Sequence, residues 1–147
     1  MLKVYIAGPI SKGCLASNVD QATRAFIKLA KAGFAPFCPH WSVYSKPVKA
    51  VSVYCGKTDQ ERPAIMCEAT SQGNDQMTHK DWVDLDLAWV RVSDAVLRLP
   101  GDSLGADREV ETAIMNHIPV YYSVEALVAD LGPLNNELRA PCSKSSA

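Results

Sequence analysis

Residues 93–122, SDAVLRLPGDSLGADREVETAIMNHIPVYY, contain the pattern that decides the fold. The short apolar run 95–99 is typical of a buried strand, and the turn residues 100–103 end it. A helical pattern follows over residues 104–117, and a second β-rich run, 118–122, closes the segment. This order predicts one βαβ unit of a parallel sheet. Ligands bind at the carboxyl ends of such strands, so we expect the functional site at the loop between strand and helix and at the first helical turn.

The N-terminal part of the chain predicts a second unit of the same kind. An apolar strand over residues 2–7 precedes a helical pattern over residues 18–32. Asn18 is a candidate N-cap for this helix, and Gly33 is a stop signal. Residues 35–39 then predict a short strand, whose two prolines favour a strand end or a position at the sheet edge.

The regular pattern is lost between residues 40 and 77, where Pro, Gly, Ser and Lys are scattered among aromatic residues. We expect an insertion here, with a short helix near residues 62–68. A long irregular segment in a compact domain is typical of a lid or an interface, and a mobile insertion without such a role is the alternative. Thr78 is a good N-cap for the helix that follows over residues 79–93.

Ser123 predicts the start of a short helix over residues 124–130, which Gly132 and Pro133 end. Together these elements predict an α/β fold: a small three-layer sandwich of the flavodoxin or Rossmann type, with a parallel sheet of about four to five strands. We expect a single domain over residues 1–133, with the insertion 40–77, and a flexible C-terminal tail over 134–147.

Composition narrows the class of protein. The chain has 147 residues and a formal net charge of −1, without the basic excess that binding to a nucleic-acid polymer requires. No apolar run approaches the roughly 20 residues needed to span a membrane, and the N-terminus lacks a signal-peptide pattern. Five cysteines without a CxxC pair favour a reduced, cytoplasmic protein. His40, Cys55, Cys67 and His79 lack metal-ligand spacing, so we expect no metal.

Two acidic residues of the helix after Thr78 differ in their neighbours. Asp86 is four residues after Trp82 and three before Trp89, within an apolar stripe. A carboxylate in such a stripe is costly unless it has a partner or a function. Asp84 instead lies near Lys80 on a polar face, where an ion pair is expected. We therefore predict a functional role for Asp86, with a buried structural role as the alternative.

Glu109 and Glu111 differ in the same way. Glu109 shares a helix face with Ala106 and Ala113, which must pack on the sheet, whereas Glu111 falls among polar residues such as Asp107. Glu109 is thus the predicted buried carboxylate and the first candidate for chemistry. A pair of carboxylates without a metal signature suits glycosidic chemistry.

Two loops predict an anion site. The loop after the first strand brings backbone amides close together and carries a hydroxyl and a cation, in the residues Gly8, Ile10, Ser11, Lys12 and Gly13. The alternative is that its glycines serve only to turn the chain. Ser103 is an N-cap candidate at the start of the next helix, and a helix N-terminus with a hydroxyl also suits a phosphate group.

Three stretches, VYIAGPI (4–10), DLAWVRVSDAVLRL (86–99) and SLGADREVETA (103–113), resemble the nucleoside 2-deoxyribosyltransferase superfamily. They are most similar to its nucleoside 5′-monophosphate N-glycosidase branch, which includes 5-hydroxymethyl-dUMP N-hydrolases. The resemblance covers residues 3–38 and 78–122 and omits the insertion. It implies that Glu109 is the nucleophile that attacks C1′, and that Asp86 assists departure of the base or orients the sugar hydroxyls.

The resemblance also implies the substrate contacts. Ser103 stands where the monophosphate hydrolases use a serine for the 5′-phosphate and the free-nucleoside transferases carry an aspartate. Further contacts are implied for Tyr5, Gly8, Ile10, Gly13 and Gly105. The chain departs from the family at Ser11, where the hydrolases carry an arginine whose charge Lys12 could replace, and at Glu111, where most members have glycine.

The expected function is therefore N-glycosidic cleavage of a nucleoside 5′-monophosphate without a cofactor, and the resemblance implies a homodimer or homotetramer. One alternative is a deoxyribosyltransferase that exchanges bases on a nucleotide or nucleoside. Another is a non-catalytic nucleotide-binding or sensor module, in which Glu109 is merely a buried helix residue.

Overall fold

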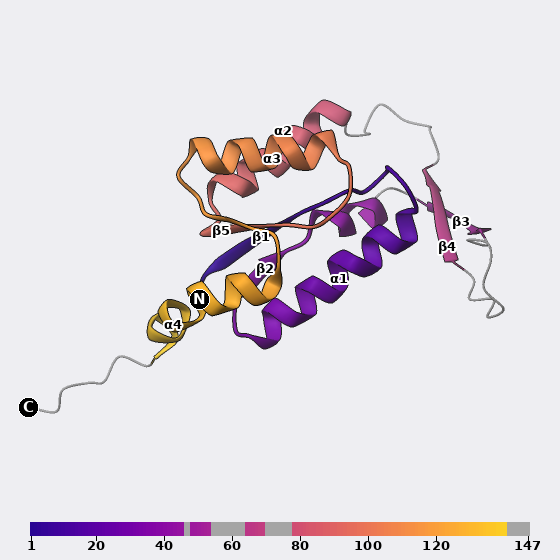
Figure 1. Cartoon of the computed structure of the whole chain (residues 1–147). Coiled ribbons are helices and arrows are strands. Elements are labelled where there is room, and N and C mark those ends of the chain that lie inside the picture. The colour runs from indigo at the N-terminus through magenta and orange to yellow at the C-terminus, as the bar shows by residue number, and fades with distance from the viewer. Residues whose placement is uncertain (46–47, 54–63, 70–77, 141–147) are drawn as a thin grey trace, which may run out of the picture.

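The computed structural model describes residues 1–45, 48–53, 64–69 and 78–140. Its centre is a four-stranded parallel sheet in the order β2-β1-β5-β6, made of Ala35–Phe37, Lys3–Ala7, Ala95–Arg98 and Val120–Tyr121. Helices α1 (Leu15–Lys31) and α4 (Val124–Arg139) cover one face, and α2 (His79–Arg91) and α3 (Leu104–Met115) cover the other (Figure 1). The predicted three-layer α/β fold is confirmed, with β2 at a sheet edge.

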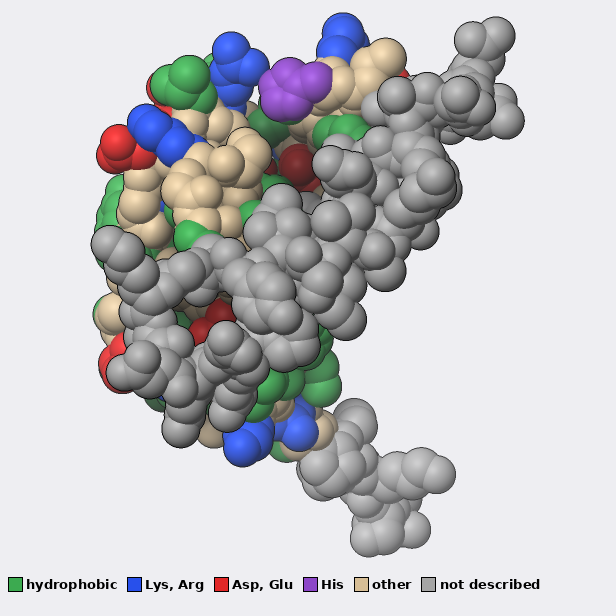
Figure 2. Space-filling model, turned by 90° about the vertical axis from the view of Figure 1, so that its right-hand side faces the viewer, with side chains coloured by type: hydrophobic (Ala, Val, Ile, Leu, Met, Phe, Trp, Pro, Cys, Tyr) green, Lys and Arg blue, Asp and Glu red, His purple; other side chains and the backbone are tan. Residues whose placement is uncertain are grey.

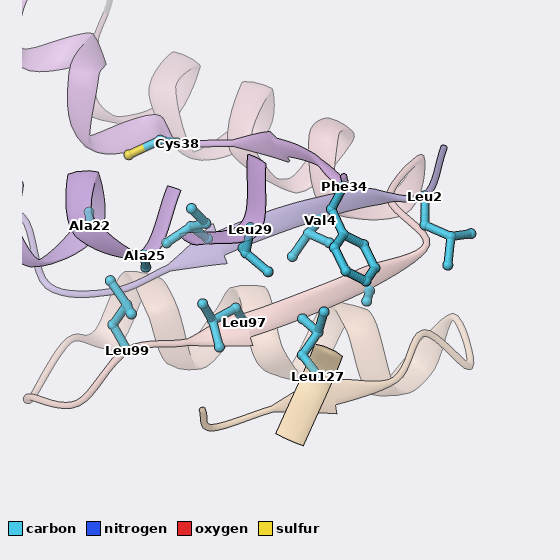
Figure 3. Close-up of a cluster of buried hydrophobic side chains, with 12 residues drawn as sticks. Leu2, Val4, Ala22, Ala25, Leu29, Phe34, Cys38, Leu97, Leu99 and Leu127 are labelled. Atoms are coloured by element: carbon cyan, nitrogen blue, oxygen red, sulfur yellow. The ribbon is translucent and has the colours of Figure 1, made fainter. Parts of the chain in front are cut away.

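The central strand β1 is buried on both faces, and its side chains alternate between the two helix layers. Val4 and Ile6 belong to the apolar cluster shared with α1 and α4, part of which is drawn in Figure 3. Tyr5 and Ala7 belong to the cluster on the opposite face, shared with α2 and α3. The alternation thus directs the Tyr5 side chain towards α3.

The strand order reverses between β1 and β5, because the chain leaves β1 towards β2 and later returns to the other side of β1. The loops that follow these two strands lie side by side. Leu99 N donates to Ala7 O at 2.7 Å. A Cβ added to Gly101, whose φ is +112°, would come within 3.0 Å of Pro9. Such a switch point is where open parallel sheets bind ligands.

The described parts of the predicted insertion contain regular structure. A 3-10 helix, η1, spans Pro39–Ser45, and two antiparallel strands, β3 (Val48–Val53) and β4 (Ala64–Ala69), pair to form a separate sheet (Figure 1). The predicted helix near residues 62–68 is therefore wrong, because pairing with β3 supplies the backbone hydrogen bonds of β4. Residues 46–47, 54–63 and 70–77 of the predicted lid lie outside the described residues.

Helix α1 begins before its predicted N-cap. Its first residue is Leu15, with Cys14 at the N-cap position. Asn18 lies inside the helix and donates from its side-chain amide to Ile10 O at 3.0 Å and to Lys12 O at 2.9 Å. The prediction failed because the Asn18 side chain reaches the loop carbonyls instead of a helix amide. The predicted stop at Gly33 is confirmed, with φ at +88°.

Helix α4 continues through Gly132 and Pro133 as far as Arg139, so the predicted end of this helix and the predicted tail over residues 134–139 are wrong. The reason is a long-range contact. Asn135 is fully buried; its Oδ1 accepts from Leu2 N at 2.8 Å, and its Nδ2 donates to Gly33 O at 3.2 Å. These two bonds hold the second half of α4 against the fold and offset the helix-breaking effect of proline. Residues 141–147 of the predicted tail lie outside the described part of the chain.

We expect Asn135→Ala to lower the free energy of unfolding by about 2 to 3 kcal/mol, because the substitution leaves the Leu2 amide without its buried acceptor. Urea unfolding followed by circular dichroism measures the change. Asn136→Ala is the matched control, since Asn136 is the exposed neighbour in the same helix. Equal stability of the two variants would contradict this account of α4.

Candidate active site

A cavity of about 260 Å³ opens at the carboxyl ends of β1 and β5, at the switch point of the sheet. Four segments line it: the loop after β1, Ser42 of η1, one face of α2 and the beginning of α3. Figure 2 looks onto this edge of the molecule and shows acidic atoms set back behind neighbouring side chains. The two carboxylates predicted to be functional, Asp86 and Glu109, both line the cavity.

Glu109 is the buried carboxylate of the site, with 8% of its surface exposed. The hydroxyl of Tyr5, which is fully buried on β1, donates to Glu109 Oε1 at 3.0 Å. The other oxygen, Oε2, has no hydrogen-bond partner among the described residues. Tyr5 therefore holds one carboxylate oxygen, while the second is buried and stays unpaired among the described residues. Glu111 is exposed, so the predicted contrast between the two glutamates is confirmed.

Asp86 is half-buried on α2 and faces the same cavity as Glu109. Asp84 points to solvent and forms an ion pair with Lys80. The predicted separation of the two aspartates by helix face is confirmed. The structure therefore brings Asp86 and Glu109 together from two different helices, which gives the cavity a pair of carboxylates.

Burial controls the ionisation of this pair. Desolvation raises the pKa of Glu109 to about 7, and the hydrogen bond from Tyr5 opposes part of the shift. Desolvation also raises the pKa of Asp86 to about 6, against an opposing effect of Tyr5. Burial and the neighbouring carboxylates raise the pKa of Tyr5 above its ordinary value, so its hydroxyl remains a proton donor. The pair can thus carry a single proton near neutral pH, as acid–base chemistry requires.

The predicted anion-binding residues divide into two groups. Gly8, Ile10, Ser11, Ser103 and Gly105 line the cavity. The Ser103 hydroxyl accepts from Ala106 N at 3.2 Å and so acts as the N-cap of α3, as predicted. The start of α3 therefore faces the cavity with a capping hydroxyl and its first-turn amides.

Lys12 and Gly13 are absent from the described lining of this cavity. Lys12 forms an exposed ion pair with Asp102 at 3.1 Å, which joins the loop after β1 to the loop after β5. Gly13 has a φ of +86° and turns the chain into α1. Tyr5 contributes through its bond to Glu109 rather than as a wall of the cavity.

Sequence reasoning missed most of the α2 wall. Besides Asp86, this helix contributes the side chains His79, Trp82, Val83 and Leu87 to the cavity. Helical spacing places these residues close to Asp86 on α2, so the sequence position of Asp86 could have predicted them. The N-termini of α2 and α3 both lie at this cavity, and Thr78 caps α2 by accepting from Asp81 N.

A second, more apolar cavity of about 290 Å³ adjoins the first. The two share Ser42, Trp82 and Asp86. The second cavity is lined mostly by aromatic and aliphatic side chains at the end of β2, including Phe26, Phe37, Trp41 and Leu85. Asp86 therefore stands between a polar compartment that contains Glu109 and an apolar compartment suited to a flat ring.

His40 supports the loop after β1 from behind. It is fully buried, and its Nε2 lies 3.2 Å from Pro9 O. Burial lowers the pKa of His40 to about 4, so the neutral ring can donate to this carbonyl. A Cβ at Gly8 would lie 3.2 Å from the same nitrogen, which explains the need for glycine there. His40 is held by a contact with Pro9, which is distant in the chain, so sequence spacing could not predict its position.

Within the described ranges, no three His, Cys, Asp or Glu side chains are grouped to hold a metal ion. Over the same ranges, no helix has the length and apolar character needed to cross a membrane.

The fold is similar to that of a solved 2-deoxyribosyltransferase from the psychrotolerant bacterium Bacillus psychrosaccharolyticus, with a TM-score of 0.51. The alignment covers 80% of this chain and 69% of that enzyme, at 15% sequence identity. No family model matches the chain, and no curated protein matches its sequence. At this identity the likeness shows a common fold.

We expect Glu109→Gln to stabilise the protein above neutral pH. The pKa of Glu109 is raised from 4.5 to about 7, so its carboxyl holds a proton more tightly in the folded state. The stabilisation of the folded wild type by this proton is complete below about pH 4.5 and is lost as the pH rises through about 7. Glutamine keeps the neutral form, so we expect the variant to gain about 2 to 3 kcal/mol over wild type at about pH 8.

Urea unfolding of wild type, Glu109→Gln and the exposed control Glu111→Gln at about pH 4.5 and about pH 8 measures this difference. Compared with wild type, only Glu109→Gln should be more stable at about pH 8 than it is at about pH 4.5. A gain of the same size in both variants would show that the raised pKa of Glu109 is not its cause.

Proposed function

We propose that the protein belongs to the nucleoside 2-deoxyribosyltransferase superfamily and cleaves the base–sugar bond of a nucleoside 5′-monophosphate. The single observation that carries this proposal is the buried Glu109 carboxylate in the wall of the cavity, held at one oxygen by Tyr5, with the other oxygen buried and without a hydrogen-bond partner among the described residues. The similar fold of a solved 2-deoxyribosyltransferase supports the proposal, as do the sequence stretches that resemble this superfamily.

The proposed reaction proceeds in two steps. Glu109 Oε2 attacks C1′ of the sugar while the C1′–N bond breaks and its electron pair leaves with the base. Asp86 donates a proton to the departing base, or orients the sugar hydroxyls for the attack. Water then attacks C1′ of the glycosyl-enzyme and loses a proton to the Asp86 carboxylate, or to solvent if Asp86 only orients the sugar, while the C1′–O bond to Glu109 breaks, the sugar phosphate is released and the Glu109 carboxylate is restored.

The two compartments suit the two ends of such a substrate. We place the base in the apolar cavity, where Phe37 and Trp41 offer aromatic surfaces beside Asp86. We place the 5′-phosphate near Ser103 and Gly105, where amides at the N-terminus of α3 attract an anion. The sugar then lies between them, over Glu109.

Two other functions use the same residues. A deoxyribosyltransferase would resolve the glycosyl-enzyme with a second base instead of water. A nucleotide sensor would bind the same ligand without bond cleavage, and Glu109 would then only shape the cavity. Detection of a covalent sugar on Glu109 by mass spectrometry excludes the sensor, and exchange of a labelled base identifies the transferase.

We expect the protein to release a free base from at least one nucleoside 5′-monophosphate and, under the same conditions, more slowly from the matching nucleoside. Chromatography of a panel of both substrate classes measures the release. Glu109→Gln should lower the rate by at least about 1,000-fold because the nucleophile is lost, while Glu111→Gln should retain it. No release from any substrate, with or without an acceptor base, would contradict the proposal, and faster release from the nucleosides would overturn the phosphate assignment.

The pH dependence tests the roles of the two carboxyl groups. Protonation of Glu109 removes the nucleophile, so kcat/KM should fall as the pH drops below about 7. If Asp86 supplies the proton, kcat/KM should also fall as the pH rises and Asp86 ionises, and Asp86→Asn should lose this alkaline limb together with about 100-fold or more of the rate. Asp84→Asn is the control, because Asp84 lies on the solvent face of the same helix. Wild-type activity of Asp86→Asn would remove Asp86 from the mechanism.

A further inference from the structure

Arg98 is a largely buried cation beside the proposed active site that the mechanism above does not use. It ends strand β5, and its side chain is only 11% exposed. Along this strand Leu97 packs in the cluster with α1 and α4, whereas Val96 packs in the cluster with α2 and α3. The alternation of a strand therefore directs Arg98 towards α3, the helix that carries Glu109.

The Arg98 guanidinium binds three acceptors in the segment that follows it. It donates to Leu99 O, to Gly101 O at 2.8 Å and to Asp107 Oδ1 at 2.9 Å. The first two acceptors belong to the loop between β5 and α3, and Asp107 belongs to the first turn of α3. One planar fork thus ties both ends of the loop together, a geometry that a lysine ammonium cannot reproduce.

The segment that is held by Arg98 forms one wall of the cavity that contains Glu109. Ser103 and Gly105 lie between Gly101 and Asp107, and both line that cavity. Arg98 itself lines a separate hollow of about 540 Å³ on another side of α3, together with Val110 and Tyr122. Arg98 therefore acts on the cavity through the loop and the helix rather than by contact with a ligand bound beside Glu109.

The charge of Arg98 also acts on Glu109. Three elements place titratable groups around this carboxyl: Tyr5 from β1, Asp86 from α2 and Arg98 from β5. Asp86 raises the pKa of Glu109, whereas Tyr5 and Arg98 lower it against the larger effect of burial. Arg98 is the one cation in this set, so it favours the ionised form that a nucleophile needs.

We propose that Arg98 is a positioning residue for the reaction: its guanidinium fixes the β5–α3 loop and the first turn of α3, and with them the helix that carries Glu109. The role in catalysis rests on the proposed function. The effect on the ionisation of Glu109 does not, and it can be measured without any substrate.

The test compares Arg98→Met, Arg98→Lys and Arg108→Met with wild type. Arg98→Met removes the fork and the charge, and Arg98→Lys keeps the charge alone. Arg108→Met is the matched control, because it removes the same charge from an exposed position next to Glu109 in the chain. Circular dichroism first establishes that each variant is folded. If Arg98→Met does not fold, Arg98→Lys alone tests the role of the guanidinium hydrogen bonds.

Titration of the Glu109 carboxyl by ¹³C NMR, with its signal assigned by its loss in Glu109→Gln, gives the first readout. We expect Arg98→Met to raise the pKa of Glu109 by roughly 0.5 to 1 unit, and Arg98→Lys and Arg108→Met to leave it close to wild type. An unchanged pKa in folded Arg98→Met would overturn the role of the charge.

Turnover gives the second readout. We expect kcat/KM to fall roughly 10- to 100-fold in both Arg98→Met and Arg98→Lys, because the loop and first turn lose their tie, and to stay at the wild-type level in Arg108→Met. Full activity of Arg98→Lys would overturn the role of the fork. If wild type itself has no turnover, the proposed function fails, while the titration still decides whether Arg98 controls Glu109.

Discussion

The hydrogen bond between the Tyr5 hydroxyl and Glu109 Oε1 lies at the point where the sheet, the helix layer and the cavity meet. Tyr5 comes from the central strand, and Glu109 comes from the middle of α3, so the 3.0 Å bond requires β1 and α3 to be correctly packed. The phenol stays protonated because its pKa is raised, and it can therefore always donate. Without this donor, a carboxylate at this depth would be left with the full cost of desolvation.

This bond satisfies only one of the two oxygens of the Glu109 carboxylate. A structural carboxylate in a core normally has both oxygens satisfied, whereas Glu109 has one oxygen bound and the other without a partner among the described residues. Small residues make this placement possible. Ala106 and Ala113 are buried on the same face of α3, and their short side chains let the helix approach the sheet closely enough for Glu109 to reach Tyr5. The site thus depends on close packing as much as on the two polar groups.

Periodicity explains how much of this arrangement could be predicted from the sequence. Asp86 and Asp84, like Glu109 and Glu111, differ by two positions in one helix, so local spacing alone assigns one to the inside and one to the surface. The βαβ order likewise predicts the edge of the sheet at which the site opens. These features depend on neighbours within a few residues, and the sequence contains them directly.

Other features depend on partners distant in the chain. Asn135 lies two residues after a Gly-Pro pair that predicts a helix end, and its bonds to Leu2 N and Gly33 O explain why α4 continues. The position of His40 behind Pro9 is decided in the same way. Strand β4 is a short apolar run with no decisive period, so its conformation depends on pairing with β3 rather than on its own pattern.

The charges of the cavity impose a further constraint on any anionic ligand. Two carboxyl groups would repel a phosphate placed near them, since like charges in a poorly solvated site interact strongly. Their raised pKa values reduce this repulsion, because a pair with values of about 6 and about 7 retains a proton near neutral pH. The start of α3, with Ser103 and the first-turn amides, offers the opposite polarity within the same cavity. An elongated ligand with its anionic end at α3 and its neutral ring beside Trp82 and Phe37 satisfies both conditions, whereas a compact anion centred on Glu109 satisfies neither.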